Sequence, residues 1–349
     1  MAIYLGLPNS VYSSNVTLFG GIAGAGNSLR NAIASANNSG RNNTINLDRG
    51  TYYLTNGDSI NIGDLDTTRG NLTIAGRPGS RVTIDASDQS LLGNRVFHVW
   101  PGARLTLVDL VITAGREGGI WNEGTLTLEH CIVTGNSSEI GDGGGIFNAG
   151  MLTVNNCTIS DNSAAAGNNN FDFGRGDGGG GVVIVVTPLG PAPGVNGFDG
   201  GGIYNSGTLK MDNSIVSGNS AGNGQEGFGG GNGGNGGGIY NAGNLTLSHC
   251  TISGNSAGAG GNGISGYSAG NGGSGGNGGG IFNSGDASSA RLIKTSVLLN
   301  VTGPGGTGGI YDFPDYQGAG SGGDGSLGID GSGPDLFGDF TISPKKGSF

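Results

Sequence analysis

The chain has 349 residues and a formal net charge of −10, and charged residues make up only 11% of it. Glycine accounts for 81 residues without a Gly-X-Y period, which excludes a collagen triple helix. Lys and Arg are few and scattered, so a nucleic acid is not an expected partner. No segment approaches the roughly 20 apolar residues that cross a bilayer, so we expect no membrane span.

The first predicted element is a short helix in the stretch NSLRNAIASANNSG, residues 27–40. Ser28 is suited to be its N-cap, and Leu29, Ile33 and Ala36 form an apolar face. Such a helix would cover the open strand edges at the end of a solenoid. The residues before it lack the basic region of a secretory signal, so an export route is not indicated.

Short strands are predicted after this helix. Apolar and polar residues alternate with period two in segments rich in β-branched and aromatic residues, at 45–47, 51–54, 72–76 and 82–86. We expect these segments to form the first, irregular coils of the fold.

A unit of 20 residues is repeated through the middle of the chain. Copies that open with Gly-Gly-Ile, an aromatic residue and Asn begin at Gly118, Gly144, Gly201, Gly237 and, more loosely, Gly279. The copies begin 26, 57, 36 and 42 residues apart (144−118, 201−144, 237−201 and 279−237). The extra residues always follow the same Asn-Ser pair, and insertion at one fixed position is typical of a solenoid.

The period within the unit indicates which solenoid. Three short strands are predicted in one copy, at 239–241, 245–247 and 250–252, which would make one coil of a parallel β-helix. We therefore predict an all-β, right-handed parallel β-helix with a short N-terminal capping helix and long glycine-rich insertions at its corners. The expected organisation is an N-terminal segment and cap at 1–43, the β-helix at 44–312 with insertions at 164–200, 221–236 and 257–278, and an irregular C-terminal coil or cap at 313–349.

Residues at equivalent positions of successive copies are expected to stack into ladders. Two asparagine ladders would bond amide to amide, namely Asn122, Asn148, Asn205, Asn241 and Asn283, and Asn136, Asn162, Asn219 and Asn255. A third set is interpreted as small, inward-facing core residues rather than reactive thiols or disulfides, namely Cys131, Cys157, Ser214, Cys250 and Ser296. An aromatic set is expected to form a stacked stripe, with a sugar-binding platform as the alternative: Trp121, Phe147, Tyr204, Tyr240 and Phe282.

The repeat GGI-[WFY]-N, followed by LTL-x-x-C/S-x-I-x-x-N-S, resembles the right-handed parallel β-helix repeats of bacterial surface proteins. These include chlamydial polymorphic outer-membrane-protein repeats and autotransporter passengers. The predicted helix resembles the Cys-Ser-Leu-Arg-Glu-Ala-Ile motif that opens many such proteins, with Asn27 in place of the Cys and Asn31 in place of the Glu. The resemblance implies the fold and an extracellular or cell-surface location, but no single activity, because this fold hosts lyases, hydrolases, adhesins and fibres.

Candidates for acid–base chemistry lie at the end of the second strand and in the turn that follows it. Polysaccharide lyases and hydrolases use carboxylates together with basic groups, and the residues of these types are Glu129, His130, Lys210, Asp212 and His249. Asn and Ser interrupt the acids between copies, and solvated turn residues explain them equally well. His98 lies between apolar residues and is interpreted as structural.

Two of the insertions, 221–236 and 257–278, consist mostly of Gly, Asn, Ser and Ala. Flexible decoration is one interpretation. The other is that their glycine-rich runs pack on each other as polyproline-II-like segments, since glycine has no side chain in the way.

Two further segments suggest binding. The insertion at 164–200 contains consecutive β-forming residues that we predict to mediate self-association: Val182, Val183, Ile184, Val185 and Val186. The glycine-aspartate stretch 322–335 suggests calcium binding at Asp324 and Asp330, although its spacing departs from the calcium-binding nonapeptide repeat. We expect no other cofactor.

Two functional hypotheses follow. The first is a non-enzymatic extracellular or cell-surface structural β-helix, which would serve as an adhesin, a matrix component or a self-assembling fibre subunit. Its expected partners are further copies of the chain and surface glycans. The alternative is a polysaccharide-acting lyase or hydrolase with a groove along one sheet.

Overall fold

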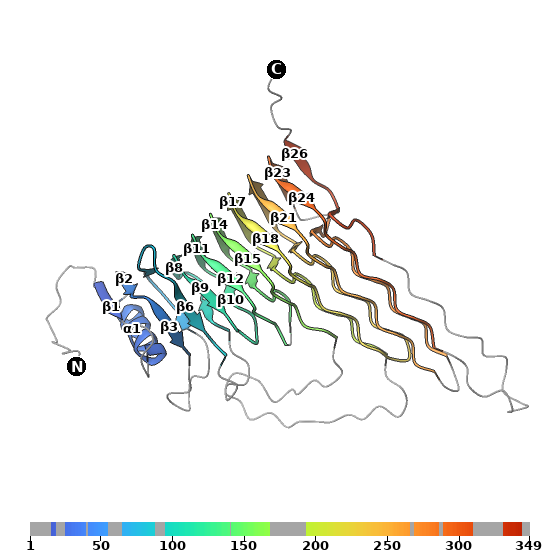
Figure 1. The fold of residues 1–349 in the computed structure, drawn as a ribbon, viewed down its shortest axis with the longest axis horizontal. Helices are drawn as coiled ribbons and strands as arrows, with labels where there is room; N and C mark the ends of the chain where they lie inside the picture. Colours follow the sequence, from blue (N-terminus) through green and yellow to red (C-terminus); the bar gives the residue numbers. More distant parts are fainter. Residues whose placement is uncertain are drawn as a thin grey trace, which may run out of the picture.

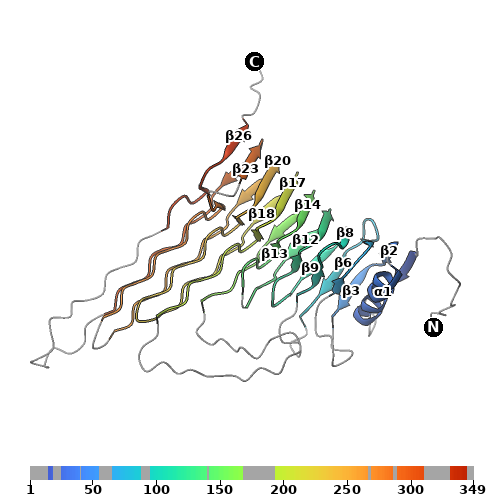
Figure 2. The same ribbon diagram turned by 180° about the vertical axis from the view of Figure 1, so that it is seen from behind.

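A computed structural model describes residues 15–18, 25–39, 41–54, 65–87, 95–139, 141–167, 193–265, 269–285, 289–309 and 331–343. Three parallel sheets run along the molecule, and each complete coil of the chain contributes one strand to each sheet (Figure 1). The predicted all-β parallel β-helix is confirmed. Seen from behind, the strands keep the same stacked order from β2 to β26 (Figure 2).

We name the three sheets A, B and C, in the order in which each coil of the chain passes through them. The strands of successive coils are in register. Sheet A contains β1 (Asn15–Leu18), β2 (Asn42–Leu47), β5 (Asn71–Gly76), β8 (Arg104–Val108), β11 (Thr125–Glu129), β14 (Met151–Asn155), β17 (Thr208–Asp212), β20 (Asn244–Ser248), β23 (Ser289–Ile293) and β26 (Thr341–Ser343). Sheet B contains β3 (Gly50–Tyr53), β6 (Val82–Asp85), β9 (Val111–Thr113), β12 (Ile132–Thr134), β15 (Thr158–Ser160), β18 (Ile215–Ser217), β21 (Thr251–Ser253) and β24 (Ser296–Leu298). Sheet C contains β4 (Leu65–Thr67), β7 (Phe97–Val99), β10 (Ile120–Asn122), β13 (Ile146–Asn148), β16 (Ile203–Asn205), β19 (Ile239–Asn241), β22 (Ile281–Asn283) and β25 (Leu336–Phe337).

The helix α1 (Ala25–Ser39) packs on β1 to β4 at the N-terminal end of the solenoid. Its predicted apolar face is confirmed, because Leu29, Ile33 and Ala36 are all buried in the core. The predicted N-cap is wrong. Ser28 lies inside the helix, because the helix already begins at Ala25. No proline interrupts it between Ala25 and Ser28.

Alternation of burial along each strand builds the core. In β11, Leu126 and Leu128 point inward while Thr125, Thr127 and Glu129 point outward. The same pattern recurs in β14 and β20, and the inward residues of all coils form one hydrophobic cluster along the axis. Each coil therefore buries its apolar face against its neighbours as well as across the core.

Both asparagine ladders are confirmed. In the first, each side-chain amide donates to the amide oxygen of the next coil at 2.6 Å, from Asn122 through Asn148, Asn205 and Asn241 to Asn283. In the second, the corresponding distances are 2.9–3.0 Å, and the ladder continues from Asn255 to Asn300.

The cysteines are buried free thiols in one inward ladder, as predicted. Ser214 continues this ladder, and its hydroxyl accepts the backbone N–H of Cys157 at 3.1 Å. The fifth member is Thr295 rather than the predicted Ser296, because the backbone N–H of Cys250 donates to the Thr295 hydroxyl at 3.4 Å. The last copy has three more residues before this position than the preceding copy (295−279 against 250−237), which shifts the register.

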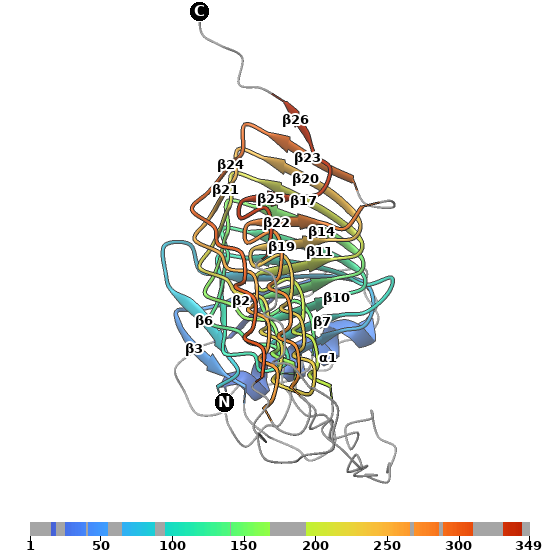
Figure 3. The ribbon, with the colours of Figure 1, turned by 90° about the vertical axis from the view of Figure 1, so that its right-hand side faces the viewer.

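The glycine-rich insertions form an ordered array beside the solenoid, visible as parallel paired lines in Figures 1 and 3. We call this the glycine-rich array, formed by residues 193–200, 221–236, 257–265, 269–278 and 301–309. Backbone hydrogen bonds between neighbouring segments recur at every third residue, as in Gly230 to Asn271, Gly233 to Ser274 and Gly236 to Asn277 at 2.8–3.0 Å. Three residues is one turn of a polyproline II helix. Of the two interpretations offered by the sequence, the structure shows the second, in which these runs pack on each other.

Candidate functional site

Four of the five sequence-predicted acid–base residues lie in two neighbouring ladders where the strands of sheet A end. Glu129 and Asp212 share a ladder with an intervening Asn155, and His130 and His249 occupy the next position in their coils. His130 and His249 are three coils apart, which is about 14 Å at the ~4.8 Å spacing of strands. The candidates therefore do not form a single site.

Backbone geometry explains the residue types in this turn. The left-handed conformation recurs at this position in six successive coils, with φ between 46° and 55° at Asp109, His130, Asn156, Asn213, His249 and Lys294. Asn, Asp and His tolerate this conformation better than most residues. The turn therefore accounts for them without a catalytic role.

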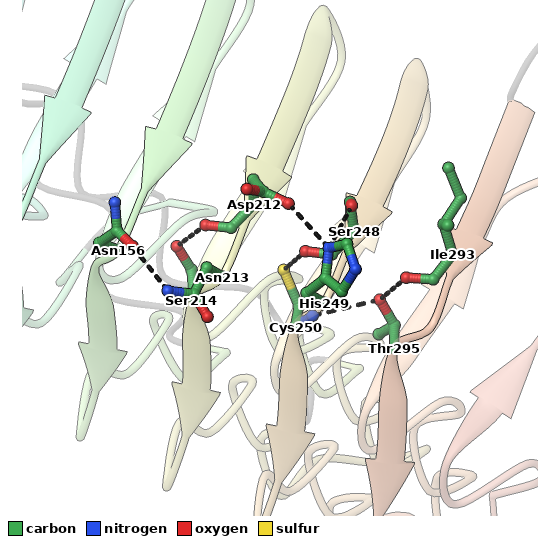
Figure 4. Close-up of polar contacts among 9 residues, drawn as sticks. All are labelled: Asn156, Asp212, Asn213, Ser214, Ser248, His249, Cys250, Ile293 and Thr295. Carbon is green, nitrogen blue, oxygen red and sulfur yellow. Dashed lines mark hydrogen bonds and ion pairs between the residues drawn. The ribbon is translucent and has the colours of Figure 1, made fainter. Parts of the chain in front are cut away.

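One part of this turn contains the side-chain types of a hydrolytic triad, shown in Figure 4. The Nδ1 atom of His249 lies 2.9 Å from the Ser248 hydroxyl and 3.2 Å from Oδ1 of Asp212. A Ser-His-Asp triad needs the serine and the aspartate on opposite imidazole nitrogens, whereas here both contact the same one. Hydrogen bonds from Ser248 and then His249 lower the pKa of Asp212 below its ordinary value. The arrangement is a surface hydrogen-bonded cluster.

Lys210 lies two positions before Asp212, on the outward face of β17. Its ladder otherwise consists mainly of threonine, with Thr153 and Thr246 on either side. The structure thus places Lys210 on a regular polar face of sheet A.

A second cluster of ionisable residues lies on the outward face of sheet C, near its N-terminal end. Asp66, His98 and Trp121 occupy one position in successive coils, in β4, β7 and β10. Trp100 and Glu123 follow two residues after His98 and Trp121, so they form a second, adjacent column. Sequence reasoning missed this cluster because His98 lies between apolar residues. Aligning FHVWPG with IWNEG would have revealed the shared column.

His98 is held between two carboxylates. Its Nδ1 lies 3.3 Å from Oδ1 of Asp66, and its Nε2 lies 3.1 Å from Oε2 of Glu123. Both imidazole nitrogens are engaged, so His98 has no ring nitrogen positioned to exchange a proton with a substrate. The two carboxylates also lie on opposite sides of the ring and do not converge on one point.

Trp100 completes this cluster. Its indole N–H donates to Oδ1 of Asp66 at 3.0 Å, and its ring stacks on His98 with centroids 4.8 Å apart. Burial raises the pKa of Asp66, but hydrogen bonds from His98 and Trp100 outweigh it, so the net pKa lies below the ordinary value. Asp66 is therefore a carboxylate at neutral pH.

The aromatic stripe continues from this cluster along sheet C. Successive rings stack nearly parallel, with centroids 3.9 Å apart for Trp121 and Phe147 and 5.0–5.1 Å apart from Phe147 through Tyr204, Tyr240 and Phe282 to Phe337. Arg95 covers the outer face of Trp121, with its guanidinium 4.4 Å from the ring centroid. Each interior ring therefore has both faces occupied, and the geometry is that of a stacked stripe.

Several predicted sites lie outside the described residues: the self-association segment Val182–Val186 and the calcium candidates Asp324 and Asp330. Within the described ranges, no three His, Cys, Asp or Glu side chains are grouped to bind one metal ion. No helix in the described part of the chain has the length and apolar character to cross a membrane.

Comparison with known proteins adds one structure. No protein-family model and no curated protein matches this chain. A crystal structure of the pectate lyase Pel9A is similar with a TM-score of 0.37 and 13% identity, over 95% of this chain and 78% of the other. Similarity at this level transfers neither residues nor activity.

Proposed function

We propose that this chain is a non-enzymatic, exported β-helical rod that serves at the cell surface or in an extracellular matrix as an adhesin or structural subunit. The observation that carries the proposal is the continuity of its ladders. Asparagine, aromatic and threonine ladders pass through successive coils on different faces, and the asparagine and aromatic ladders join the coils from β10 to β22 by side-chain contacts as well as backbone bonds. Such coupling between neighbouring coils favours a stiff rod whose interior coils resist local unfolding.

The chemistry of the outer faces supports the same proposal. The middle outward ladder of sheet A contains Thr44, Thr73, Thr106, Thr127, Thr153, Lys210, Thr246 and Arg291. Of the groups proposed for catalysis, Asp212 and His249 are hydrogen-bonded to each other in a surface turn, and His98 is engaged on both nitrogens. A regular, sparsely charged surface suits a protein that is displayed and makes extended contacts.

The test separates this rod from a polysaccharide-acting enzyme. The purified chain is incubated with pectins, alginate and glycosaminoglycans, with and without calcium, and new reducing ends and unsaturated uronates are measured. We expect no product. Product formation that Asp212→Asn or His249→Ala abolishes would overturn the proposal in favour of the enzyme.

Self-association through Val182–Val186 is a separate part of the proposal, supported by the run of β-forming residues in the sequence. Light scattering of the double variant Val183→Lys, Val185→Lys tests it. We expect a lower mass than for the unchanged chain, and an unchanged assembly state would contradict it.

A further inference from the structure

Repeated copies of a solenoid differ where a local function has been added, and sheet C has one such place. In the coils from β13 to β22, the column beside the aromatic stripe holds small residues: Ala149, Ser206, Ala242 and Ser284. In the coils of β7 and β10 the same column holds Trp100 and Glu123. A large aromatic ring and a carboxylate thus replace small side chains at one end of an otherwise uniform face.

Trp100 differs from the rings of the aromatic stripe because one of its two ring faces is available to a ligand. Trp100 is 45% exposed, and its only stacking partner among the described residues is His98. Its bond to Asp66 fixes the direction of the indole N–H as well as the ring plane. A ring held in this way loses little conformational entropy when a ligand binds on its free face.

The polar groups around Trp100 determine what kind of ligand fits. The side chains of Asp66 and Glu123 are 42% and 36% exposed, so their carboxylates can accept hydrogen bonds from a ligand beside the ring. A pyranose has this combination, with C–H groups on its ring face for the π-system and hydroxyl donors at its edge.

Charge selects among pyranoses. The Asp66 carboxylate accepts the Trp100 indole N–H, and the Glu123 carboxylate contacts His98, which stacks on the same indole. Burial of an acidic sugar near these carboxylates would be opposed by repulsion. Of the nearby cations, Arg30 acts electrostatically on Asp66, and Arg95 is placed over Trp121 and lies 3.8 Å from Glu117. The site is therefore suited to neutral sugars and unsuited to uronates.

We propose that Trp100, with the carboxylates of Asp66 and Glu123, forms a binding subsite for a neutral pyranose unit of a glycan. This inference rests on the proposed function, since it gives the rod a chemical class of partner. The indole supplies the stacking face, and the carboxylates accept hydroxyl protons and exclude acidic sugars.

The chain provides its own probe, because it contains only two tryptophans. Trp100 is exposed, whereas Trp121 lies between Arg95 and Phe147. Titration with cellohexaose, chitohexaose and hexagalacturonate is followed by tryptophan fluorescence and by calorimetry. We expect saturable binding of at least one neutral hexasaccharide and none of hexagalacturonate at neutral pH.

Variants identify the site. Trp100→Ala should weaken binding at least about tenfold, while Trp100→Phe keeps a stacking face and should lose less. Tyr53→Ala, which removes an aromatic ring that is 55% exposed on sheet B, is the matched control and should bind normally. Thermal unfolding of each variant verifies the fold.

The outcomes are distinct. Binding by neither neutral sugar, equal or tighter binding of hexagalacturonate, or binding unaffected by Trp100→Ala would each overturn the inference. Analysis of the sugars after incubation is independent of it, because cleavage of the oligosaccharides would instead overturn the proposed non-enzymatic function.

Discussion

The side-chain oxygen of Asn219 accepts two hydrogen bonds from one residue of the preceding coil, from the backbone N–H of Asn162 at 3.0 Å and from its side-chain amide at 2.9 Å. Asn219 in turn donates to the carbonyls of Ile159 and Ser217 and to the amide oxygen of Asn255. Both asparagines are buried, so each of these bonds satisfies a group that water does not reach. The ladder is thus a hydrogen-bonding framework inside the solenoid.

Replacing Asn219 by Ala should therefore destabilise the solenoid strongly. The change leaves buried donors and acceptors on Asn162 and on the turn without partners, and we expect a loss of roughly 2–4 kcal/mol in the free energy of unfolding. Denaturant unfolding followed by circular dichroism measures it. Asn244→Ala, an exposed asparagine on β20, is the control and should cost less than about 0.5 kcal/mol. Equal losses for the two variants would contradict this account of the ladder.

The ladders could be predicted from sequence because the repeat itself aligns their members. Asparagine at one phase in every copy has a simple physical reason, since stacked amides satisfy each other and the turn backbone. The same alignment failed at the last copy, where Thr295 rather than Ser296 follows Cys250 in its ladder. The last copy has more residues before this position than the preceding copies, so the period of the repeat alone does not determine which residue enters the ladder.

The glycine-rich array should depend on glycine at its interior positions. A Cβ atom on Gly258 would lie 1.8 Å from the carbonyl oxygen of Gly222, so Gly258→Ala requires the segments to separate. We expect a destabilisation of roughly 2–4 kcal/mol and faster hydrogen exchange in residues 221–236 and 257–265, with the sheets less affected.

Gly229 supplies the control for that substitution. Nothing lies within 4 Å of a Cβ built on it, so Gly229→Ala meets open space. It should leave exchange in the array unchanged and alter stability by less than about 1 kcal/mol. If Gly258→Ala behaved like Gly229→Ala, the packed array would not describe the protein in solution.

The cysteines should be unreactive while the chain is folded. Cys131 and Cys250 are buried, and the pKa of each thiol is raised above its ordinary value, by the hydrogen bond with Cys157 and then burial for Cys131, and by burial for Cys250. Thiolate is the reactive form, so both effects slow the reaction of these two thiols with a thiol reagent. The hydrogen bond with Cys131 lowers the pKa of Cys157, so burial is what protects this thiol. A colorimetric thiol reagent should label few of the three cysteines in native protein and all three in denaturant. Rapid labelling of native protein would mean that the ladder is not closed.

The candidate site was harder to predict than the fold because it depends on where the copies differ. The resemblance and the repeat directed attention to Glu129, Asp212 and the histidines beside them, which the structure places in a left-handed turn. The cluster around His98 involves Asp66, in a coil before the recognisable repeat, and a contact between columns. Neither the position of Asp66 nor the contact between columns follows from the period of the sequence repeat, since the pairing of β4 with β7 is a property of the folded chain.

A pair of stacked aspartates should make stability depend on pH. Oδ1 of Asp142 accepts the backbone N–H of Asp199 at 2.7 Å, and Oδ1 of Asp199 accepts that of Asn235 at 2.5 Å, so both continue a ladder that uses asparagine in the next coils. Burial, with the nearby charge of Asp142, raises the pKa of Asp199 from 3.8 to about 6. A carboxyl whose pKa is higher in the folded state favours folding when protonated. Its contribution is therefore present below about pH 4 and is lost as the pH rises through 6.

Asp199→Asn should remove this dependence, because an amide keeps the accepting oxygen without a charge. At pH 7 we expect the variant to be more stable by roughly 1–3 kcal/mol and its melting temperature to vary less between pH 4 and 7. Asp161→Asn makes the same charge change at an exposed turn and should leave the profile as it is. Calorimetric unfolding of the unchanged chain and of the two variants across this pH range tests the prediction. A variant no more stable than the unchanged chain at pH 7 would show that Asp199 is adequately solvated or paired as a carboxylate.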